Sequence, residues 1–118
     1  MRLTDTNTVD FLGLEKDTGY VVLTLVDDFD WVDDIQHLSL LQSKVNRYFD
    51  FIESGEVYEQ LRETTGREVG KETPIKISIL AKHEPSSEGR RFMEHLAHVA
   101  EDAGMSFSFK VIPVDGVY

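Results

Sequence analysis

Residues 33–52 of the chain read DDIQHLSLLQSKVNRYFDFI. Apolar side chains recur in this stretch at spacings of three and four residues, which places them on one face of an α-helix. This expected core stripe consists of Leu38, Leu41, Val45, Phe49 and Ile52. Asp33 or Asp34 can cap the start, because a carboxylate there accepts hydrogen bonds from free backbone N–H groups, and Ser54-Gly55 supplies the end. The stretch therefore predicts one long amphipathic helix around which the other elements are organised.

Two β-rich runs precede this helix, TVDFLGL at residues 8–14 and YVVLTLV at residues 20–26. The link between them is short and polar and ends in Gly19, a combination that is typical of a β-hairpin. Both alternating sets of side chains in the second run are largely apolar. We therefore expect that strand to be central in its sheet and covered on both faces.

Four further elements follow the long helix. Their hydrophobic periodicity and capping signals predict a short helix at 56–64, a strand at 74–82 with one buried face, a helix from Ser86 or Ser87 to Ala103, and a strand at 105–111. The order ββα(α)βαβ predicts a single α+β domain over residues 1–118, with loose tails at 1–7 and 113–118. Because helical crossovers usually join parallel strands, we expect a four-stranded mixed sheet with an antiparallel first strand and a helical layer packed on it.

The composition narrows the classes of function. The chain has 118 residues, with 22 acidic and 12 basic side chains and a net charge of −10. This charge argues against nucleic acid as a partner, because binding to phosphate depends mainly on Lys and Arg. It permits a basic protein partner, although solubility alone is the simpler explanation of the charge. The absence of cysteine excludes disulfides and thiolate metal sites.

The same composition bears on location. No apolar run approaches the ~20 residues that a membrane helix needs. No apolar segment of a secretory signal follows Met1. We therefore expect a cytoplasmic protein without a membrane partner.

Two groups of side chains could hold a metal ion. On the second long helix, His95, His98 and Asp102 share one stripe, and two imidazoles with a carboxylate can ligate zinc. A polar helix flank explains the same residues, and Arg91 on that stripe would repel a cation. The acidic turn at residues 27–34 supplies oxygen ligands for Ca²⁺ or Mg²⁺ but lacks the Gly and Glu of an EF-hand loop. Helix capping is the alternative reading of that turn.

No residue pattern points to nucleophilic catalysis or to a cofactor. Cysteine is absent, no Gly-x-Ser-x-Gly elbow occurs, and the eight glycines are scattered singly, not gathered in a phosphate-binding loop. We therefore expect no catalytic residues and no cofactor.

One feature of the long helix indicates an interaction surface. On the face that points away from the expected core stripe, four residues recur at spacings of four, three and four: Leu40, Lys44, Arg47 and Phe51. Two exposed apolar groups beside two bases favour a partner-binding strip, since aromatic and Arg residues are enriched at interface centres. The alternative is that the 56–64 helix or the 113–118 tail covers this strip.

Several short motifs spread over nearly the whole chain carry a resemblance. They are Val9-Asp10-Phe11, Val22-Leu23-Thr24-Leu25, Trp31, His37-Leu38, Leu41-Gln42, Lys44, Asn46, Tyr48, Phe51-Ile52-Glu53-Ser54-Gly55, Glu84-Pro85 and Ala103-Gly104. With these motifs the chain resembles a family of small bacterial proteins of unknown function. The resemblance implies a single domain and brings no activity, cofactor or catalytic residue. The chain departs from the family at Leu61-Arg62-Glu63-Thr64, where the family has a Tyr-Pro turn.

These observations support one leading hypothesis and two rivals. The leading one is a small acidic protein-interaction module without catalysis, similar to antitoxins or immunity proteins, that binds a protein or a second copy through the helix strip. The acidic turn is a second candidate surface. One rival is a metal-binding protein or metal-dependent enzyme that uses His95, His98 and Asp102. The other is a homodimer with a ligand pocket between the helices and the sheet.

Overall fold

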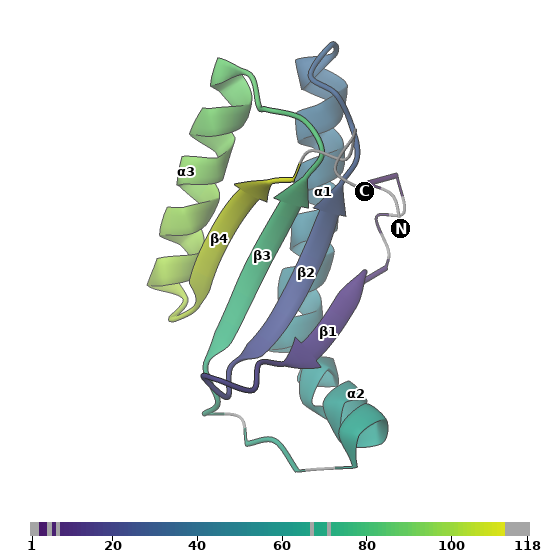
Figure 1. Cartoon of the computed structure of the whole chain (residues 1–118), viewed down its shortest axis with the longest axis vertical. Coiled ribbons are helices and arrows are strands. Elements are labelled where there is room, and N and C mark those ends of the chain that lie inside the picture. Colours follow the sequence, from purple (N-terminus) through teal and green to yellow (C-terminus); the bar gives the residue numbers. More distant parts are fainter. Residues whose placement is uncertain (1–2, 5, 7, 67, 71, 113–118) are drawn as a thin grey trace.

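The computed structural model describes residues 3–4, 6, 8–66, 68–70 and 72–112 (Figure 1). In chain order, its elements are β1 (Phe11–Leu14), β2 (Val21–Asp27), α1 (Asp34–Glu53), α2 (Glu56–Thr65), β3 (Ile75–Ala81), α3 (Ser87–Asp102) and β4 (Ser106–Val111). The predicted order ββα(α)βαβ is therefore confirmed. The expected tail at 113–118 lies outside the described residues.

The helix starts follow the local sequence signals. The Asp33 carboxylate accepts a hydrogen bond from the backbone N–H of Gln36 at 3.1 Å, and the Ser86 hydroxyl accepts one from Gly89 at 3.2 Å. Each bond satisfies a donor that the first helical turn leaves without an intrahelical partner. After α1, the chain turns at Gly55, whose φ of 84° lies in the left-handed region that favours glycine. The long helix therefore begins and ends where its sequence predicts.

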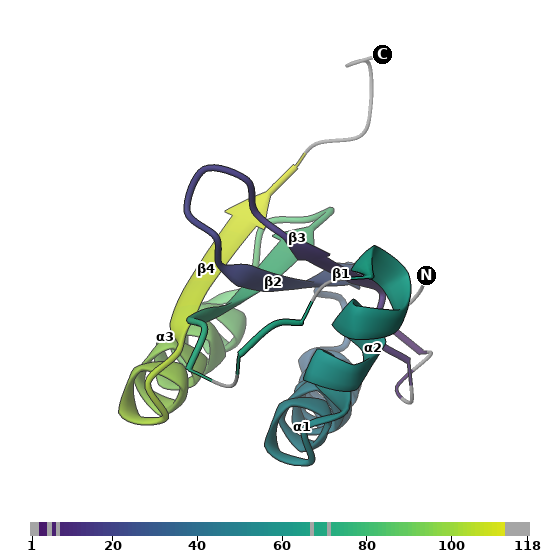
Figure 2. The same ribbon diagram turned by 90° about the horizontal axis from the view of Figure 1, so that it is seen from below.

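The four strands form one sheet in the order β1-β2-β3-β4. β1 runs antiparallel to β2, whereas β2, β3 and β4 run parallel to one another. The expected four-stranded mixed sheet with an antiparallel first strand is confirmed. Both crossovers move in the same direction across the sheet, from β2 to β3 and from β3 to β4. Right-handed connections in one direction place their helices on one face, and Figure 2 shows α1 and α3 on the same side of the sheet.

The expectation that β2 is covered on both faces is wrong. Val21, Leu23 and Leu25 point toward the helices and are fully buried. Val22 and Val26 point the other way and are half-buried. Since both crossover helices lie on one side, no described helix covers the opposite side. We call this uncovered side of the sheet the open face.

The buried stripe of α1 also differs from the expected one. Its buried residues are His37, Leu41, Lys44, Val45, Tyr48 and Phe51. The expected core residues Leu38, Phe49 and Ile52 are only half-buried. α1 is thus rotated so that three polar or charged side chains, together with Phe51, enter the core. Each of the large apolar groups buried here contributes about 1.5–3 kcal/mol to the free energy of unfolding.

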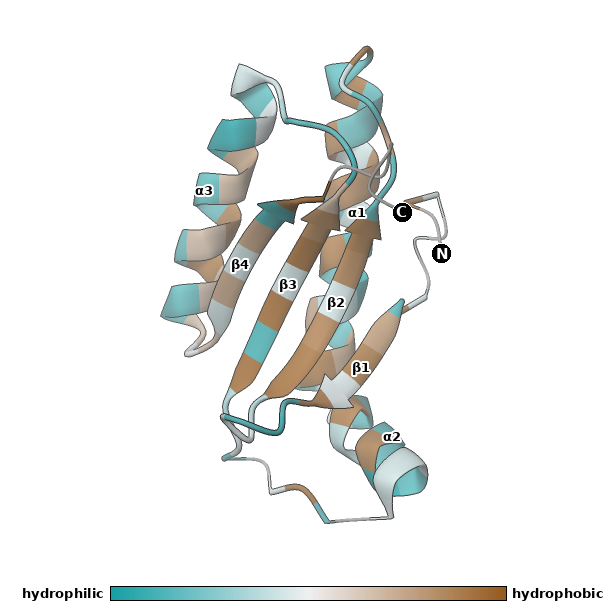
Figure 3. Ribbon diagram, in the orientation of Figure 1, coloured by the Kyte–Doolittle hydropathy of each residue, from teal (hydrophilic) through white to brown (hydrophobic). Residues whose placement is uncertain are grey.

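The distribution of hydropathy agrees with this two-layer arrangement. Figure 3 shows apolar residues along the strands and on parts of each helix, with polar residues between them. Within the described ranges, no helix has the length and apolar character required to cross a membrane.

Candidate functional site

The structure corrects the exposure expected for the helix strip. Lys44 is fully buried and Phe51 is 7% exposed, while Leu40 is half-buried and packs against the core. Arg47 lies over the Phe51 ring, 5.8 Å from its centroid, and pairs with Glu56 at 3.6 Å. The strip is therefore not an exposed surface. As the alternative reading held for the helix at 56–64, Glu56 of α2 contacts the strip.

A hollow remains beside two of the strip residues. It measures about 520 Å³, and Val9, Arg47, Phe51, Glu56 and Gln60 contribute to its lining. The hollow lies between the segment before β1 and the helices α1 and α2. Arg47 is the strip residue whose charge is still partly accessible, since its side chain is 31% exposed.

The residues expected to bind a metal ion lie on α3. His95, His98 and Asp102 are all exposed. Among the described residues, no group of three or more His, Cys, Asp or Glu side chains is placed to hold a metal ion. In the acidic turn, the Asp30 and Asp33 carboxylates accept backbone N–H groups, as expected for turn and cap residues. The Asp28 carboxylate accepts the N–H of Leu3, which is fully buried although it belongs to the expected loose tail.

Lys44 belongs to a buried polar cluster that the sequence reading missed. Its Nζ lies 2.7 Å from Oδ1 of Asp10, and the second carboxylate oxygen of Asp10 accepts the N–H of Val26 at 2.8 Å. The Tyr48 hydroxyl accepts the N–H of Asp10 and donates to the carbonyl of Thr24, both at 2.8 Å. The cluster thus joins the segment before β1 to α1 and to β2.

The electrostatics of this cluster act on Tyr48. Burial away from water is the main factor that raises the pKa of the Tyr48 hydroxyl above its ordinary value of 10.0, and the negative charge of Asp10 raises it further. The hydroxyl therefore stays protonated at neutral pH and can donate to Thr24. Both Asp10 oxygens have partners, so this carboxylate stabilises the packing of the segment before β1 against α1 and β2.

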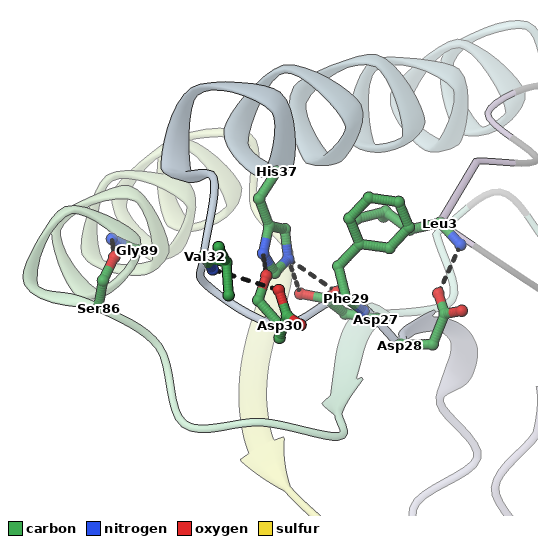
Figure 4. Close-up of polar contacts among 9 residues, drawn as sticks. All are labelled: Leu3, Asp27, Asp28, Phe29, Asp30, Val32, His37, Ser86 and Gly89. Carbon is green, nitrogen blue, oxygen red and sulfur yellow. Dashed lines mark hydrogen bonds and ion pairs between the residues drawn. The ribbon is translucent and has the colours of Figure 1, made fainter.

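A second buried cluster lies at the carboxyl end of β2, as Figure 4 shows. His37 of α1 points to Asp27, and its Nε2 lies 2.8 and 2.7 Å from the two carboxylate oxygens. The other ring nitrogen, Nδ1, lies 2.9 Å from the carbonyl oxygen of Asp30. Both His37 and Asp27 are fully buried. The indole of Trp31 stacks on the imidazole with a centroid separation of 3.6 Å.

The proton positions follow from these partners. A carbonyl oxygen only accepts, so Nδ1 of His37 donates to Asp30, while Nε2 faces the Asp27 carboxylate. Both ring nitrogens are therefore engaged inside the protein. In this geometry the imidazole has no nitrogen that could take a proton from a bound molecule. The cluster joins α1 to the carboxyl end of β2.

Trp31 extends this cluster to α3. A Cβ atom placed on Gly89 would lie 2.6 Å from the Trp31 ring, so the indole lies directly against the backbone at the start of α3. The indole Nε1 is buried and has no hydrogen-bond partner among the described residues. Trp31 and Phe29 pack against the core.

The strand registers define the rows of side chains on the open face. The middle row is Phe11, Thr24, Ser78 and Ser108. The row toward the strand starts is Gly13, Val22, Lys76 and Ser106. The row toward the carboxyl ends of the parallel strands is Val26, Leu80 and Lys110. The hydroxyls of Ser78 and Ser108 are 3.3 Å apart and hydrogen-bonded.

A shallow apolar hollow lies at one end of the open face. It measures about 320 Å³, and its apolar lining comes from Val26, Leu80, Ala81 and Ile112. Asp27, Asp28 and Lys82 complete the lining. The hollow lies outside the carboxyl ends of the parallel strands, which is where α/β sheets commonly bind ligands.

Sequence reasoning identified part of this surface. The alternation of Lys76 and Ser78 with buried isoleucines predicts a strand with one uncovered face, and the buried Ile77 and Ile79 confirm it. The apolar Val22 and Val26 concealed the same property in β2. Asp10, Asp27 and His37 gave no local signal, because each finds its partner ten or more residues away in the sequence.

Comparison with known proteins adds a family. Neither curated proteins nor solved structures gave a match. The chain belongs to a family of unknown function, DUF6572, whose family model matches residues 1–113.

Proposed function

We propose that the protein is a small, non-catalytic protein-interaction module of the bacterial cytoplasm that binds its partner through the open face. The observation that carries this proposal is the one-sided sheet. The helices cover one side, while the other presents Phe11, Val22, Val26 and Leu80 among hydroxyl and lysine side chains. Phe11 is 48% exposed, so a large aromatic group is available for contact.

The two buried clusters support the non-catalytic part of this proposal. Asp10 and Lys44 pair with each other, and His37 has both nitrogens engaged by Asp27 and Asp30. These titratable side chains stabilise the packing of α1 on β2. The groups left accessible on the open face are hydroxyls, ammonium groups and apolar side chains, which serve recognition better than acid–base chemistry.

The size and charge of the chain also fit this function. A protein of 118 residues with a net charge of −10 stays soluble while it presents one contact surface. The same size and charge fit a role like that of antitoxins or immunity proteins, which bind one partner protein. The metal-binding alternative gains no comparable support, because His95, His98 and Asp102 are exposed on α3.

Site-specific photo-cross-linking tests the proposal. The cross-linker p-benzoylphenylalanine replaces Ser78 at the centre of the open face, and in a matched control it replaces the exposed Ala97 of α3. Each variant is irradiated as purified protein and in lysate of the native host, after circular dichroism has verified its fold. We expect one specific adduct from Ser78 and none from Ala97.

Competition makes this result specific. Excess wild-type protein should suppress the Ser78 adduct, whereas a Phe11→Asp/Leu80→Asp competitor should not. An adduct in the purified sample identifies the partner as a second copy of the chain. Equal labelling from Ser78 and Ala97, or no adduct from either, would overturn the proposed function.

A further inference from the structure

The basic side chains of the described residues fall into two groups, those paired with an acid and those without such a pair. Arg47, Arg62, Arg90 and Arg91 each pair with a glutamate, and Lys44 pairs with Asp10. The other described cations are Lys16, Lys76, Lys82 and Lys110, whose side-chain ammonium groups form no hydrogen bond or ion pair with described residues. Except for Lys16 in the β1–β2 hairpin, these lysines lie on the open face or at its rim.

The three rows of the open face also lack acidic side chains. None of the outward positions in its three rows carries Asp or Glu, although the chain has 22 acidic residues and 12 basic ones. Two acids, Asp27 and Asp28, line the hollow; Asp27 is buried and pairs with His37, and Oδ1 of Asp28 accepts the N–H of Leu3. An acidic protein therefore carries a locally basic surface whose ammonium groups have no partner within the part of the chain that the structure describes.

We infer, building on the proposed function, that the partner docks an acidic segment with an apolar anchor side chain on the open face. Carboxylates of that segment pair with Lys76 and Lys110, and the anchor enters the apolar hollow between Val26, Leu80 and Ile112. A hollow of about 320 Å³ suits one large apolar side chain. Lys82 at the rim adds a third ammonium group.

The strand registers set the spacing of the partner's charges. Lys76 lies four residues before Leu80 on β3, and Leu80 pairs with Lys110. At about 3.3 Å per residue, the two lysine rows are about 13 Å apart along the strands. Acidic residues four positions apart in an extended segment span the same distance, with the apolar anchor adjacent to the one that meets Lys110.

Nucleic acid is the other polyanion that lysines could bind. The net charge of −10 opposes it, because a duplex or single strand would extend past the three lysines to the surrounding acidic surface. The apolar hollow likewise favours a protein segment over a phosphate backbone. An acidic protein segment matches both the charge and the apolar character of the open face.

The first test uses defined probes and ¹⁵N-labelled protein. The probe is the peptide EEELFEEE, with EEEAAEEE and KKKLFKKK as controls and a single-stranded oligonucleotide of eight thymidines as the alternative polyanion. We expect EEELFEEE to shift the amide signals of Lys76, Leu80 and Lys110 and to leave those of α3 unchanged. EEEAAEEE should bind at least fivefold more weakly, and added salt should weaken both.

Charge reversal supplies the matched variants. Lys76→Glu/Lys110→Glu should lower the affinity for EEELFEEE by at least tenfold, whereas Lys16→Glu, which reverses another unpaired lysine, should leave it unchanged. The same two proteins, each carrying the cross-linker at Ser78, then report on the natural partner. We expect the adduct to be lost with Lys76→Glu/Lys110→Glu and kept with Lys16→Glu.

These outcomes separate the inference from the proposed function. If the Ser78 adduct survives charge reversal of Lys76 and Lys110, the open face still binds a partner, and the acidic segment is the wrong class. Equal or tighter binding of KKKLFKKK or of the oligonucleotide, or no response to EEELFEEE at millimolar concentration, would also overturn the inference. If the Ser78 adduct is absent from the start, the proposed function itself fails.

Discussion

The ammonium group of Lys44 lies 2.7 Å from the carboxylate of Asp10, and these side chains are 0% and 1% exposed. A charge buried this completely is costly unless its partner is present. The pair forms where α1 crosses beneath β2, and Asp10 also accepts the N–H of Val26. The segment before β1 is therefore held in place partly by an ion pair buried inside the protein.

Removing one member of this pair should destabilise the protein strongly. Lys44→Met leaves the Asp10 carboxylate buried without its counter-ion, and we expect the free energy of unfolding to fall by about 3–5 kcal/mol. Asp10→Asn/Lys44→Met removes both charges and should recover much of that loss. Urea unfolding followed by circular dichroism measures the changes.

An exposed ion pair provides the control for this experiment. Arg62 is 59% exposed and lies 3.5 Å from Glu68. Arg62→Met should therefore change the free energy of unfolding by less than about 1 kcal/mol. A loss from Lys44→Met no larger than that from Arg62→Met would show that the Asp10–Lys44 pair is accessible to water in solution.

Tyr48 should make stability depend on pH in the alkaline range. Burial raises the pKa of the folded-state hydroxyl above its ordinary 10.0, so above pH 10 the unfolded chain loses this proton while the folded protein keeps it. The free energy of unfolding then falls by up to about 1.4 kcal/mol per pH unit between the unfolded-state and folded-state pKa values. Below pH 10 the hydroxyl is protonated in both states and adds no slope.

Tyr48→Phe isolates this effect. The variant should lose about 1–3 kcal/mol at neutral pH, because the Asp10 N–H and the Thr24 carbonyl lose their partner. Its deficit relative to the wild type should then shrink above pH 10, where the other tyrosines and the lysines affect both proteins alike. Urea unfolding between pH 8 and 11 measures the difference. A constant deficit across this range contradicts the raised pKa.

Gly89→Ala should destabilise the protein although it replaces glycine in a helix. In a free helix this change usually stabilises by about 0.5–1 kcal/mol. Here the new Cβ would lie 2.6 Å from the Trp31 ring, so the indole or the start of α3 must move. We expect a net loss of about 1–3 kcal/mol, measured by urea unfolding, with a change in Trp31 emission.

Gly13→Ala is the matched control for this substitution. No heavy atom lies within 4 Å of the position that a Cβ at Gly13 would occupy, and its φ does not require glycine. This variant should keep the wild-type Trp31 emission. A stable Gly89→Ala protein with unchanged emission would show that Trp31 does not rest against α3 in solution.

The elements of this fold were predictable because each one carries its own local signal. α1 shows helical periodicity together with Asp33 at its start, and β3 alternates Ile75, Ile77 and Ile79 with polar residues. The order of the elements and the right-handed rule for crossovers then determine a mixed sheet. These signals depend on residues that are close together in the sequence.

The side-chain partners were not predictable in the same way. A lysine in a helix usually points to solvent, whereas Lys44 is buried and pairs with Asp10, which lies 34 residues earlier in the sequence. Val22 and Val26 are apolar enough for a buried position, yet the direction of both crossovers leaves them on the open face. Which side of a helix or sheet faces the core depends on how the layers pack together. Local patterns in one sequence do not specify that packing.

Binding of the partner at the helix strip and binding at the open face lead to opposite predictions for two variants. Arg47 pairs with Glu56 and is 31% exposed, so Arg47→Glu should change the free energy of unfolding by no more than about 1 kcal/mol. If the partner docks on the open face, excess Arg47→Glu protein should suppress formation of the Ser78 adduct as well as excess wild-type protein does. Ser78→Arg places a large charged group in the middle row of the open face and should compete poorly. The reverse pattern would instead assign binding to the hollow between α1 and α2, where Arg47 and Phe51 lie.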